Sequence, residues 1–248
     1  MSFTSRFSDR ADDYAASRPA YSDDALDFIL DGLTLPLHVA DIGAGTGISS
    51  RLLAQRGADV VAVEPNAAMS EKAAAHPGVH FVHGTGERTG LASASVDLAT
   101  AFQAFHWFAT DAALREIRRI VRPGGRAVLI LNERDERDAF THAYGDLFRQ
   151  YPLDNTEARR EASLTFFTRL QGKVVEREFP NEQTVDLAGL QGRTASSSYL
   201  PRDGAAGDAM RRDVEALFTR FARDGKVRIA LRTIVVRIDL RRVSAEFL

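Results

Sequence analysis

The stretch Val39-Ala-Asp-Ile-Gly-Ala-Gly-Thr-Gly47 decides the fold of this chain, because an apolar run leads directly into three closely spaced glycines. Glycine lets the backbone turn tightly and lets a ligand approach where a Cβ would block it. Glu64 ends the next apolar run, Val60-Val-Ala-Val63, after one helical segment. In a doubly wound sheet this order places a carboxylate beside the glycine loop, where it can accept hydrogen bonds from ribose hydroxyls.

Strand and helix patterns alternate on both sides of this stretch. Apolar runs typical of buried strands occur at residues 38–42, 60–63, 79–82, 96–101 and 126–131. Helical patterns cover residues 22–32, 48–57, 66–76 and 110–121. The alternation predicts βαβ units, right-handed crossovers and a parallel sheet.

The second half of the chain is less regular. Residues 133–170 are polar with helical character, and further helices are expected at 184–192 and 206–223. Residues 173–179 and 227–240 are β-rich. The stretch Gly189 to Gly207 is rich in Gly, Ser and Arg, and its composition predicts a loop.

Composition and charge limit the classes of function. The 248 residues include 32 basic and 34 acidic side chains and no cysteine, for a net charge of −2. Balanced charge favours neither nucleic acid nor an anionic membrane as partner. Without cysteine, disulfides and Cys-built metal sites are excluded, and no metal is expected. No apolar run approaches the roughly 20 residues that span a bilayer, and no signal pattern begins the chain, so we expect a cytoplasmic protein.

The glycine spacing separates several classes of nucleotide site. A dinucleotide fingerprint needs G-x-G-x-x-G/A, but the third position is Ile48 or Ser50, depending on which glycine begins the motif. A P-loop is excluded because no G-K-[ST] follows. The spacing is instead D-x-G-x-G-x-G, with Asp41 in front.

That pattern resembles motif I of the class I S-adenosylmethionine-dependent methyltransferases, and further motifs of the family follow in order. They are Val63-Glu-Pro-Asn-Ala-Ala-Met69, Gly84-Thr-Gly-Glu87 with Leu91 and Ser95-Val-Asp97, and Leu114-Arg-Glu-Ile-Arg-Arg-Ile-Val-Arg-Pro-Gly-Gly125. Similarity is greatest to the methyltransferase type 11 branch, which includes trans-aconitate-methyltransferase-like small-molecule enzymes. It extends to Phe7–Tyr14, Arg18–Tyr21 and Gln103–Phe108, and covers residues 3–134.

The patterns and the resemblance together predict an α/β fold. We expect a doubly wound, mostly parallel, seven-stranded Rossmann-like sheet with helices on both faces, an antiparallel strand near the C-terminus and a helical cap. One domain would span 1–248. It would comprise an N-terminal lid (1–21), a cofactor-binding core (34–132), a region with cap insertions (133–225) and a C-terminal strand (226–241).

The resemblance implies S-adenosyl-L-methionine as cofactor and S-adenosyl-L-homocysteine as product. Asp41 is expected either to be structural or to contact the methionine ammonium through water. Thr85 stands where many relatives carry an Asp that accepts from the adenine amino group, so Glu87 or backbone groups are alternatives. The cofactor-binding residues implied are Asp41, Gly43, Ala44, Gly45, Gly47, Glu64, Pro65, Met69, Thr85, Gly86, Glu87, Gln103, Tyr14 and Arg18.

The segment Ala101-Phe-Gln-Ala-Phe-His-Trp-Phe108 follows the fourth strand, and the resemblance places it beside the sulfonium methyl. His106 is a candidate catalytic base, and Gln103 a candidate for aligning the cofactor or substrate. The alternative is that His106 only lines the pocket. The aromatic side chains either wall off water or pack in the core.

The expected partner is a small-molecule methyl acceptor, with neither nucleic acid nor membrane involved, and the protein is expected to be a monomer or homodimer. The acceptor would enter under the cap, where Arg134, Arg137, Arg193 and Arg202 are candidates for a carboxylate clamp. Two alternative functions stay open: an NAD-dependent oxidoreductase and a non-catalytic S-adenosylmethionine-binding module.

Overall fold

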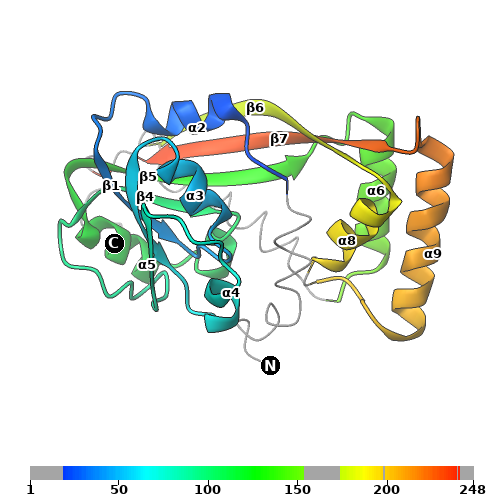
Figure 1. The fold of residues 1–248 in the computed structure, drawn as a ribbon, viewed down its shortest axis with the longest axis horizontal. Helices are drawn as coiled ribbons and strands as arrows, with labels where there is room; N and C mark the ends of the chain where they lie inside the picture. The colour runs from blue at the N-terminus through cyan, green and yellow to red at the C-terminus, as the bar shows by residue number, and fades with distance from the viewer. Residues whose placement is uncertain (1–18, 154–173, 198, 239, 241–248) are drawn as a thin grey trace. The chain divides into compact units, whose positions relative to one another are not determined.

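The structure is a computed structural model, described here for residues 19–153, 174–197, 199–238 and 240. A seven-stranded sheet has the strand order β3-β2-β1-β4-β5-β7-β6 (Figure 1). The strands are β1 (Leu37–Ile42), β2 (Ala58–Val63), β3 (Val79–Val82), β4 (Val96–Phe102), β5 (Val121–Arg134), β6 (Val174–Val185) and β7 (Val227–Ile238).

Strands β1 to β5 pair in parallel, and the C-terminal strand β7 is antiparallel, which confirms the predicted fold class. Because β2 and β3 lie on one side of β1, and β4 and β5 on the other, the strand order reverses between β1 and β4. In open α/β sheets, ligands bind beyond the carboxyl ends of the strands at such a switch point.

The helices lie between the strands along the chain. They are α2 (Asp23–Leu30), α3 (Ile48–Ala54), α4 (Ala67–Glu71), the 3₁₀ helix η2 (Phe105–Trp107), α5 (Asp111–Ile120), α6 (Ala139–Gln150), α8 (Leu187–Ala195) and α9 (Gly204–Phe221). No helix among the described residues is long and apolar enough to cross a membrane.

The described residues form two compact units. Unit 1 takes in the described parts of Met1–Ser22, Asn132–Thr156 and Phe179–Thr233. Unit 2 takes in those of Asp23–Leu131, Glu157–Glu178 and Ile234–Leu248. The division after Leu131 lies next to residue 132, where the sequence analysis ends the cofactor-binding core.

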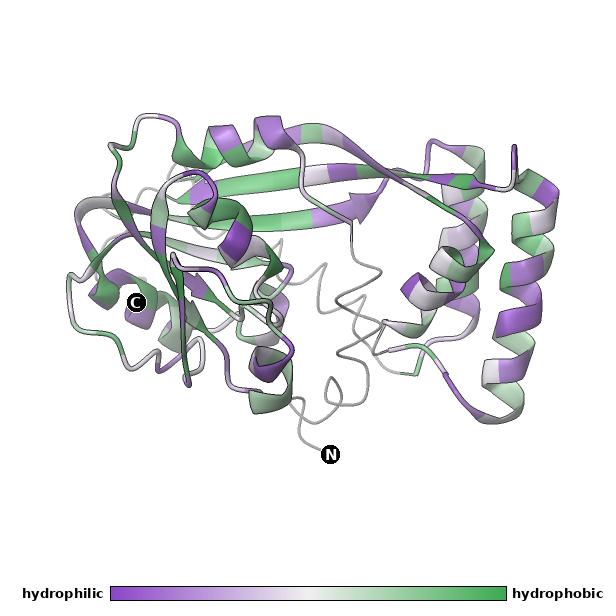
Figure 2. Cartoon of the chain, in the orientation of Figure 1, coloured by the Kyte–Doolittle hydropathy of each residue, from purple (hydrophilic) through white to green (hydrophobic). Residues whose placement is uncertain are grey.

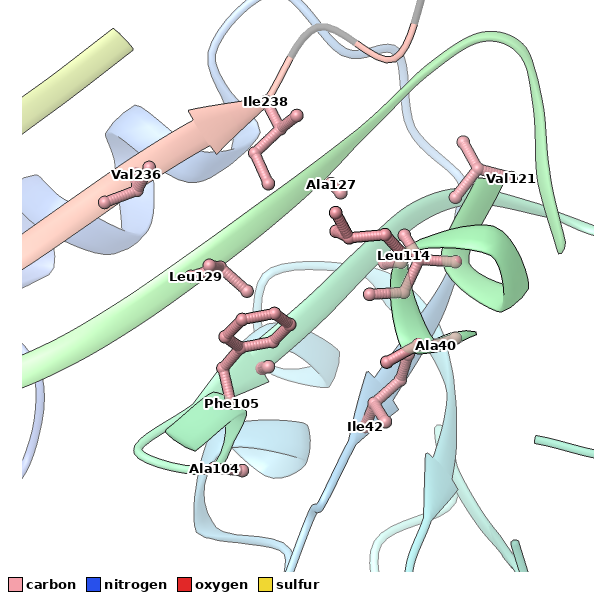
Figure 3. Close-up of a cluster of buried hydrophobic side chains, with 14 of the residues drawn as sticks. Ala40, Ile42, Ala104, Phe105, Leu114, Val121, Ala127, Leu129, Val236 and Ile238 are labelled. Carbon is pink, nitrogen blue, oxygen red and sulfur yellow. The ribbon is translucent and has the colours of Figure 1, made fainter. Parts of the chain in front are cut away.

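The core of unit 2 is an apolar cluster in which side chains of β1, β4, β5 and β7 meet those of α5 and η2 (Figure 3). Helix α5 supplies Leu114, Ile117 and Ile120, which recur every three residues and therefore share one face. Thr110 begins this helix, since its hydroxyl accepts from the Ala113 amide at 3.1 Å. The apolar face of α5 thus fixes the helix against the sheet.

Unit 1 has its own core, built mainly from α6, α8 and α9. Tyr144 is fully buried, and its hydroxyl lies 2.8 Å from the Thr194 hydroxyl, which in turn donates to the Leu190 carbonyl. Helix α9 is amphipathic: hydrophilic and hydrophobic residues alternate along its turns in Figure 2, and Met210 and Val214 are buried.

The predicted loop from Gly189 to Gly207 is wrong over most of its length. Residues up to Ala195 belong to α8, which contains most of the helix predicted at 184–192, and α9, predicted at 206–223, begins at Gly204. Asp186 caps α8 by accepting from the Gly189 amide at 2.8 Å, and Leu190 anchors the helix in the core. Composition was misleading here because a cap and one buried leucine outweigh the low helix propensity of glycine and serine.

Two other boundaries differ from the sequence prediction. Strand β5 begins at Val121, so Arg122-Pro-Gly-Gly125 is part of the strand rather than a stop before it, and the strand continues to Arg134. A Cβ on Gly125 would lie 2.5 Å from the Asp97 carbonyl, so the backbones approach closely there. Helix α4 ends at Glu71, short of the predicted residue 76.

We predict that Leu114→Ala lowers the free energy of unfolding by about 2–5 kcal/mol, because it leaves a cavity beneath α5. Leu114 is 3% exposed and Leu153 is 60% exposed, so Leu153→Ala is a matched control expected to change stability by less than about 0.5 kcal/mol. Denaturant unfolding of both variants measures the difference. Equal effects would contradict this assignment of the core.

Candidate functional site

Four segments leave the sheet at one edge of unit 2. Ile42 is in register with Val63, Val63 with Val82, and Asp41 with Thr100, all in parallel pairs. The segments that follow these strand ends are therefore neighbours: residues 43–47 after β1, 64–69 after β2, 84–88 after β3 and 103–108 after β4. The structure thus brings together the predicted loop, acidic turn, adenine segment and aromatic segment.

The glycine loop is tied to the end of β2. The amides of Gly43 and Ala44 both donate to the Val63 carbonyl, at 2.8 and 3.2 Å. The Gly45 amide donates to Glu64 Oε2 at 2.8 Å. These three loop amides therefore hold the loop in shape.

Glycine is required at Gly43 and Gly47 for two reasons. Their φ angles are +73° and +70°, a region that other residues rarely adopt. A Cβ on Gly43 would also lie 2.6 Å from the Ala104 Cβ, and one on Gly47 would lie 2.8 Å from the Phe81 ring. The loop therefore packs directly on neighbouring segments.

Gly45 also has a positive φ, +58°, and a Cβ there would lie 3.3 Å from the Met69 methyl group. Met69 is buried and belongs to α4, which Asn66 caps by accepting from the Ala68 amide. The structure thus places Met69 against the glycine loop, and Pro65 between Glu64 and the cap of α4.

Asp41 is fully buried beneath the loop and accepts three hydroxyl hydrogen bonds. Ser49 and Ser50 donate from the first turn of α3 at 2.6 and 2.7 Å, and Thr100 donates from β4 at 3.0 Å. Burial raises the pKa of the Asp41 carboxyl, and the three hydrogen bonds oppose that rise. This geometry favours the structural role over the water-mediated one.

Glu64 is held in one orientation by two backbone amides. Its Oε2 accepts from Gly45, as above, and its Oε1 accepts from the Asn66 amide at 2.9 Å. Burial raises its pKa, the two amides oppose the rise, the charge of Asp41 adds to it, and that of His83 opposes it. A carboxylate has about four lone-pair sites, so both oxygens retain acceptor capacity.

Thr46 carries a buried hydroxyl within the glycine loop. Its Oγ1 has no hydrogen-bond partner among the described residues. Buried polar groups in folded proteins are nearly always satisfied, so such a group calls for an explanation. Its carbonyl, by contrast, accepts from Arg51 Nη1 at 2.9 Å.

The aromatic segment packs mainly inward. Phe102, Phe105 and Phe108 are buried, and Phe105 and Phe108 meet edge to face with centroids 5.3 Å apart. Figure 3 shows Phe105 within the apolar cluster of unit 2. These rings therefore act first as core, the second of the two roles considered from the sequence.

Gln103 and His106 remain candidates for contact with ligands. Gln103 has a φ of +53°, although it is not glycine, and its amide donates to the Ile130 carbonyl at 2.8 Å. Such backbone outliers cluster at functional sites. His106 is half-buried in η2, with its ring centroid 4.8 Å from that of Trp107.

Residues 84–88 form a tight turn. The Thr85 amide donates to the Arg88 carbonyl at 2.9 Å, and the Arg88 amide donates back to the Thr85 carbonyl at 3.2 Å and to its hydroxyl, also at 3.2 Å. Gly86 is buried against the face of Phe108, where a side chain would overlap the ring. Thr85 and Glu87 are exposed on either side of it.

The arginines considered for a carboxylate clamp have different surroundings within unit 1. Arg134 is 15% exposed, lies 4.5 Å above the Phe148 ring centroid and is 3.6 Å from Glu136. Arg193 donates to Gln183 at 2.5 Å. Arg137 is 81% exposed and pairs with Asp135, and the Arg202 carbonyl accepts from Arg211.

Tyr14 and Arg18 lie outside the described residues, as does most of the predicted lid. From that segment, Ala20 is described, and its carbonyl accepts from Asn181 at 2.8 Å and from Asn132 at 3.3 Å. Both asparagines belong to unit 1.

The sequence analysis missed several residues that shape the site. Asn66 was detectable, because Asn directly before a helix is a common cap. The serines of α3 were a weaker signal, since nothing local pairs them with Asp41. The other missed residues reach the site only through strand pairing or loop packing, which the sequence does not show. They are Thr46, Thr89, Thr100, Ala104, Thr110 and Glu116.

Comparison with known sequences agrees with this geometry. A family model described as a methyltransferase domain matches residues 40–129. An uncharacterised methyltransferase of Mycobacterium tuberculosis is 37% identical over 165 residues, which are 66% of this chain and 66% of that protein. The chain is thus matched over slightly less than two thirds of this relative's length.

Solved structures share the fold. One from Anaeromyxobacter dehalogenans, provisionally assigned as a type II methyltransferase, is 26% identical with a TM-score of 0.70, covering 90% of this chain and 98% of that one. A methyltransferase from Geobacter sulfurreducens, solved with S-adenosyl-L-homocysteine, is 16% identical with a TM-score of 0.52. It covers 96% of this chain and 98% of that one, and shows likeness of fold alone.

The resemblance found in the sequence is thereby confirmed. Residues 40–129 of this chain carry a methyltransferase domain, in agreement with the resemblance to the methyltransferase type 11 branch of the class I S-adenosylmethionine-dependent methyltransferases.

Proposed function

We propose that the protein transfers a methyl group from S-adenosyl-L-methionine to a small-molecule acceptor. This proposal rests on the contact between the glycine loop and Glu64: the Gly45 amide donates to the Glu64 carboxylate at 2.8 Å. A rigid, side-chain-free turn beside an oriented carboxylate suits a nucleoside ligand. The family match does not support the alternative of an NAD-dependent oxidoreductase.

The residues present fit the cofactor. Gly45 leaves open the space that a Cβ would fill next to Met69, and the Thr46 hydroxyl is buried without a partner among the described residues. Glu64 is buried, oriented and still able to accept hydroxyl donors. We assign the loop to the methionine part, Glu64 to the ribose and residues 84–87 to the adenine.

When bound, the cofactor supplies a methyl group on a sulfonium, which is a good leaving group. The work of the chain is then to orient the reactants and to exclude water. The rings of Phe105 and Phe108 make the floor of the site apolar. Gln103 has a strained backbone at the mouth of β4 and is suited to orienting a polar atom, and His106 is our candidate for accepting a proton.

The acceptor class follows from family and charge. Balanced charge supports a small molecule over nucleic acid. The cytoplasmic location, the monomeric or dimeric state and the identity of the acceptor stay predictions or open questions. A panel of candidate acceptors should include carboxylates, since Arg134, Arg137, Arg193 and Arg202 are candidates for a carboxylate clamp.

The proposed activity predicts acceptor-dependent release of S-adenosyl-L-homocysteine. We expect the purified chain to form this product with at least one member of a panel of hydroxyl, amine and carboxylate acceptors. The assay also separates an enzyme from a non-catalytic module. Tight cofactor binding without turnover across the panel would favour the module.

We predict that Glu64→Ala weakens S-adenosyl-L-homocysteine binding by about 2–3 kcal/mol, or about 30- to 150-fold, because hydrogen bonds to a charged group are lost. Wild-type binding should also weaken as pH falls through the raised pKa of Glu64, since the protonated carboxyl is the poorer acceptor. Calorimetric titration measures both effects. Glu71→Ala, an exposed glutamate of α4, is the control, and an unchanged dissociation constant in Glu64→Ala would remove Glu64 from the site.

We predict that Gly43→Ala abolishes measurable cofactor binding, while Gly124→Ala leaves it intact. Both glycines have positive φ, +73° and +88°, so both substitutions cost about 1–2 kcal/mol in backbone strain. The Gly43 methyl would in addition meet Ala104 at 2.6 Å, whereas the Gly124 methyl would meet nothing within 4 Å. Titration and thermal unfolding of both variants test this, and similar binding by the two would mean that the loop lies elsewhere.

A further inference from the structure

Helix α5 contacts the turn at 84–88 and the residue that follows it. At its start, the Thr110 hydroxyl donates to Glu87 Oε1 at 3.5 Å. One and a half turns further along, Glu116 accepts from Thr89, the residue that directly follows the turn. One helix therefore holds the C-terminal side of the segment that we assign to the adenine.

Thr89 belongs to a charged hydrogen-bond cluster with Glu116 and Arg119, which we call the bracket. Glu116 Oε1 accepts from the Thr89 amide at 2.8 Å and from its hydroxyl at 2.6 Å. Arg119 donates to the same carboxylate twice, from Nε to Oε2 at 2.7 Å and from Nη2 to Oε1 at 2.8 Å. Thr89 and Glu116 are both buried.

Arg119 extends the bracket along the chain that leaves the turn. Its Nη2 also donates to the Leu91 carbonyl at 2.7 Å, and its Nη1 donates to the Ser93 hydroxyl at 3.2 Å. Residues 89–93 are thereby attached to one face of α5.

The backbone of Thr89 packs directly against the start of the turn. A Cβ on Gly84 would lie 2.6 Å from the Thr89 carbonyl, so the two ends of the segment touch without a side chain between them. On the other side, Gly86 rests on the ring of Phe108. A shift of Thr89 would therefore displace the turn relative to the glycine loop, against which Phe108 also packs.

The bracket is ionised at neutral pH. The Arg119 hydrogen bonds, helped by those of Thr89, lower the pKa of Glu116 to about 2 against the opposing effect of burial. Because this pKa lies below the ordinary 4.5, its stabilising effect is present above that value and is lost as pH falls toward 2. The Arg119 side chain is 39% exposed, and partly exposed ion pairs contribute little net stability, so stability alone explains this bracket poorly.

The geometry points to Glu116 as a positioning residue that, with Arg119 and through Thr89, sets the turn at 84–88 to distinguish adenine from other purines. This inference rests on the proposed function, because it takes residues 84–87 as the adenine-binding segment. In this inference Glu116 does not contact the cofactor. Substitution of Glu116 should therefore change the affinity for the base rather than the rate of methyl transfer.

The test compares two nucleoside ligands, S-adenosyl-L-homocysteine and its 6-oxo analogue S-inosyl-L-homocysteine. Calorimetric titration gives the dissociation constant of each for wild type and Glu116→Ala. We expect the preference of the wild type for the adenine compound to fall about tenfold in the variant, the size of one well-placed hydrogen bond. Glu116→Gln should retain part of the preference, because its amide oxygen can still accept from Thr89.

Asp97→Ala is the matched control. Asp97 also joins an arginine to the backbone, since it accepts from Arg122 at 2.7 Å and from the His38 amide at 2.9 Å, but it contacts no residue of the turn. It should lower stability without changing the ratio of the two dissociation constants. If Glu116→Ala does not fold, Thr89→Val serves instead: it removes the hydroxyl, which donates to Glu116 and accepts from the Leu91 amide, but keeps the Thr89 amide bond to Glu116, and should lower the ratio by a smaller factor.

The outcomes separate this inference from the proposed function. A wild type that binds neither nucleoside would overturn the proposed function. A wild type that prefers the adenine compound, with an unchanged ratio in Glu116→Ala, Glu116→Gln and Thr89→Val, would overturn the positioning role alone. A wild type that binds both compounds equally would overturn the purine discrimination on which the inference depends.

Discussion

A single buried carboxylate, that of Asp41, organises the ligand edge of the sheet. Taking a charge out of water is costly unless hydrogen bonds replace the water, so Asp41 requires donors from three directions. They come from Ser49 and Ser50 at the start of α3 and from Thr100 on β4. The glycine loop lies between β1 and α3, and its two ends are therefore fixed by the same group.

The loop is fixed a second time from β2. Glu64 and the Val63 carbonyl together accept three loop amides, and Asn66 orients the second oxygen of Glu64. Burial raises the pKa of Glu64, and the charge of Asp41 adds to that rise. Positive φ angles and tight packing make the loop stiff, so the site is formed before any ligand arrives, and preorganisation of this kind reduces the entropy cost of binding.

The aromatic segment after β4 connects the site to the core. Phe108 packs against Gly86 of the turn that we propose binds adenine, and it lies 3.4 Å from where a Gly43 Cβ would be, so one ring sets the separation of this turn from the glycine loop. Ala104 fills the remaining space beside Gly43. The rings at this strand end therefore act mainly by packing, which sets the positions of the neighbouring segments. Gln103 and His106 are the polar side chains of the segment.

Local signals in the sequence were sufficient for the strand and helix order, the glycine loop, the position of Glu64 and the family, because apolar periodicity and closely spaced glycines act over a few residues. They were insufficient for the full extent of α8, which continues to Ala195 beyond the predicted end at residue 192 because a cap and a buried leucine outweigh composition. They also could not identify the partners of Asp41 or the bracket of Glu116 on Thr89. Those contacts join residues 59 and 27 positions apart, and exist only because β4 lies beside β1 and α5 packs on the sheet. Tertiary structure decided them, since a buried charge takes its donors from whichever strands and helices the fold places next to it.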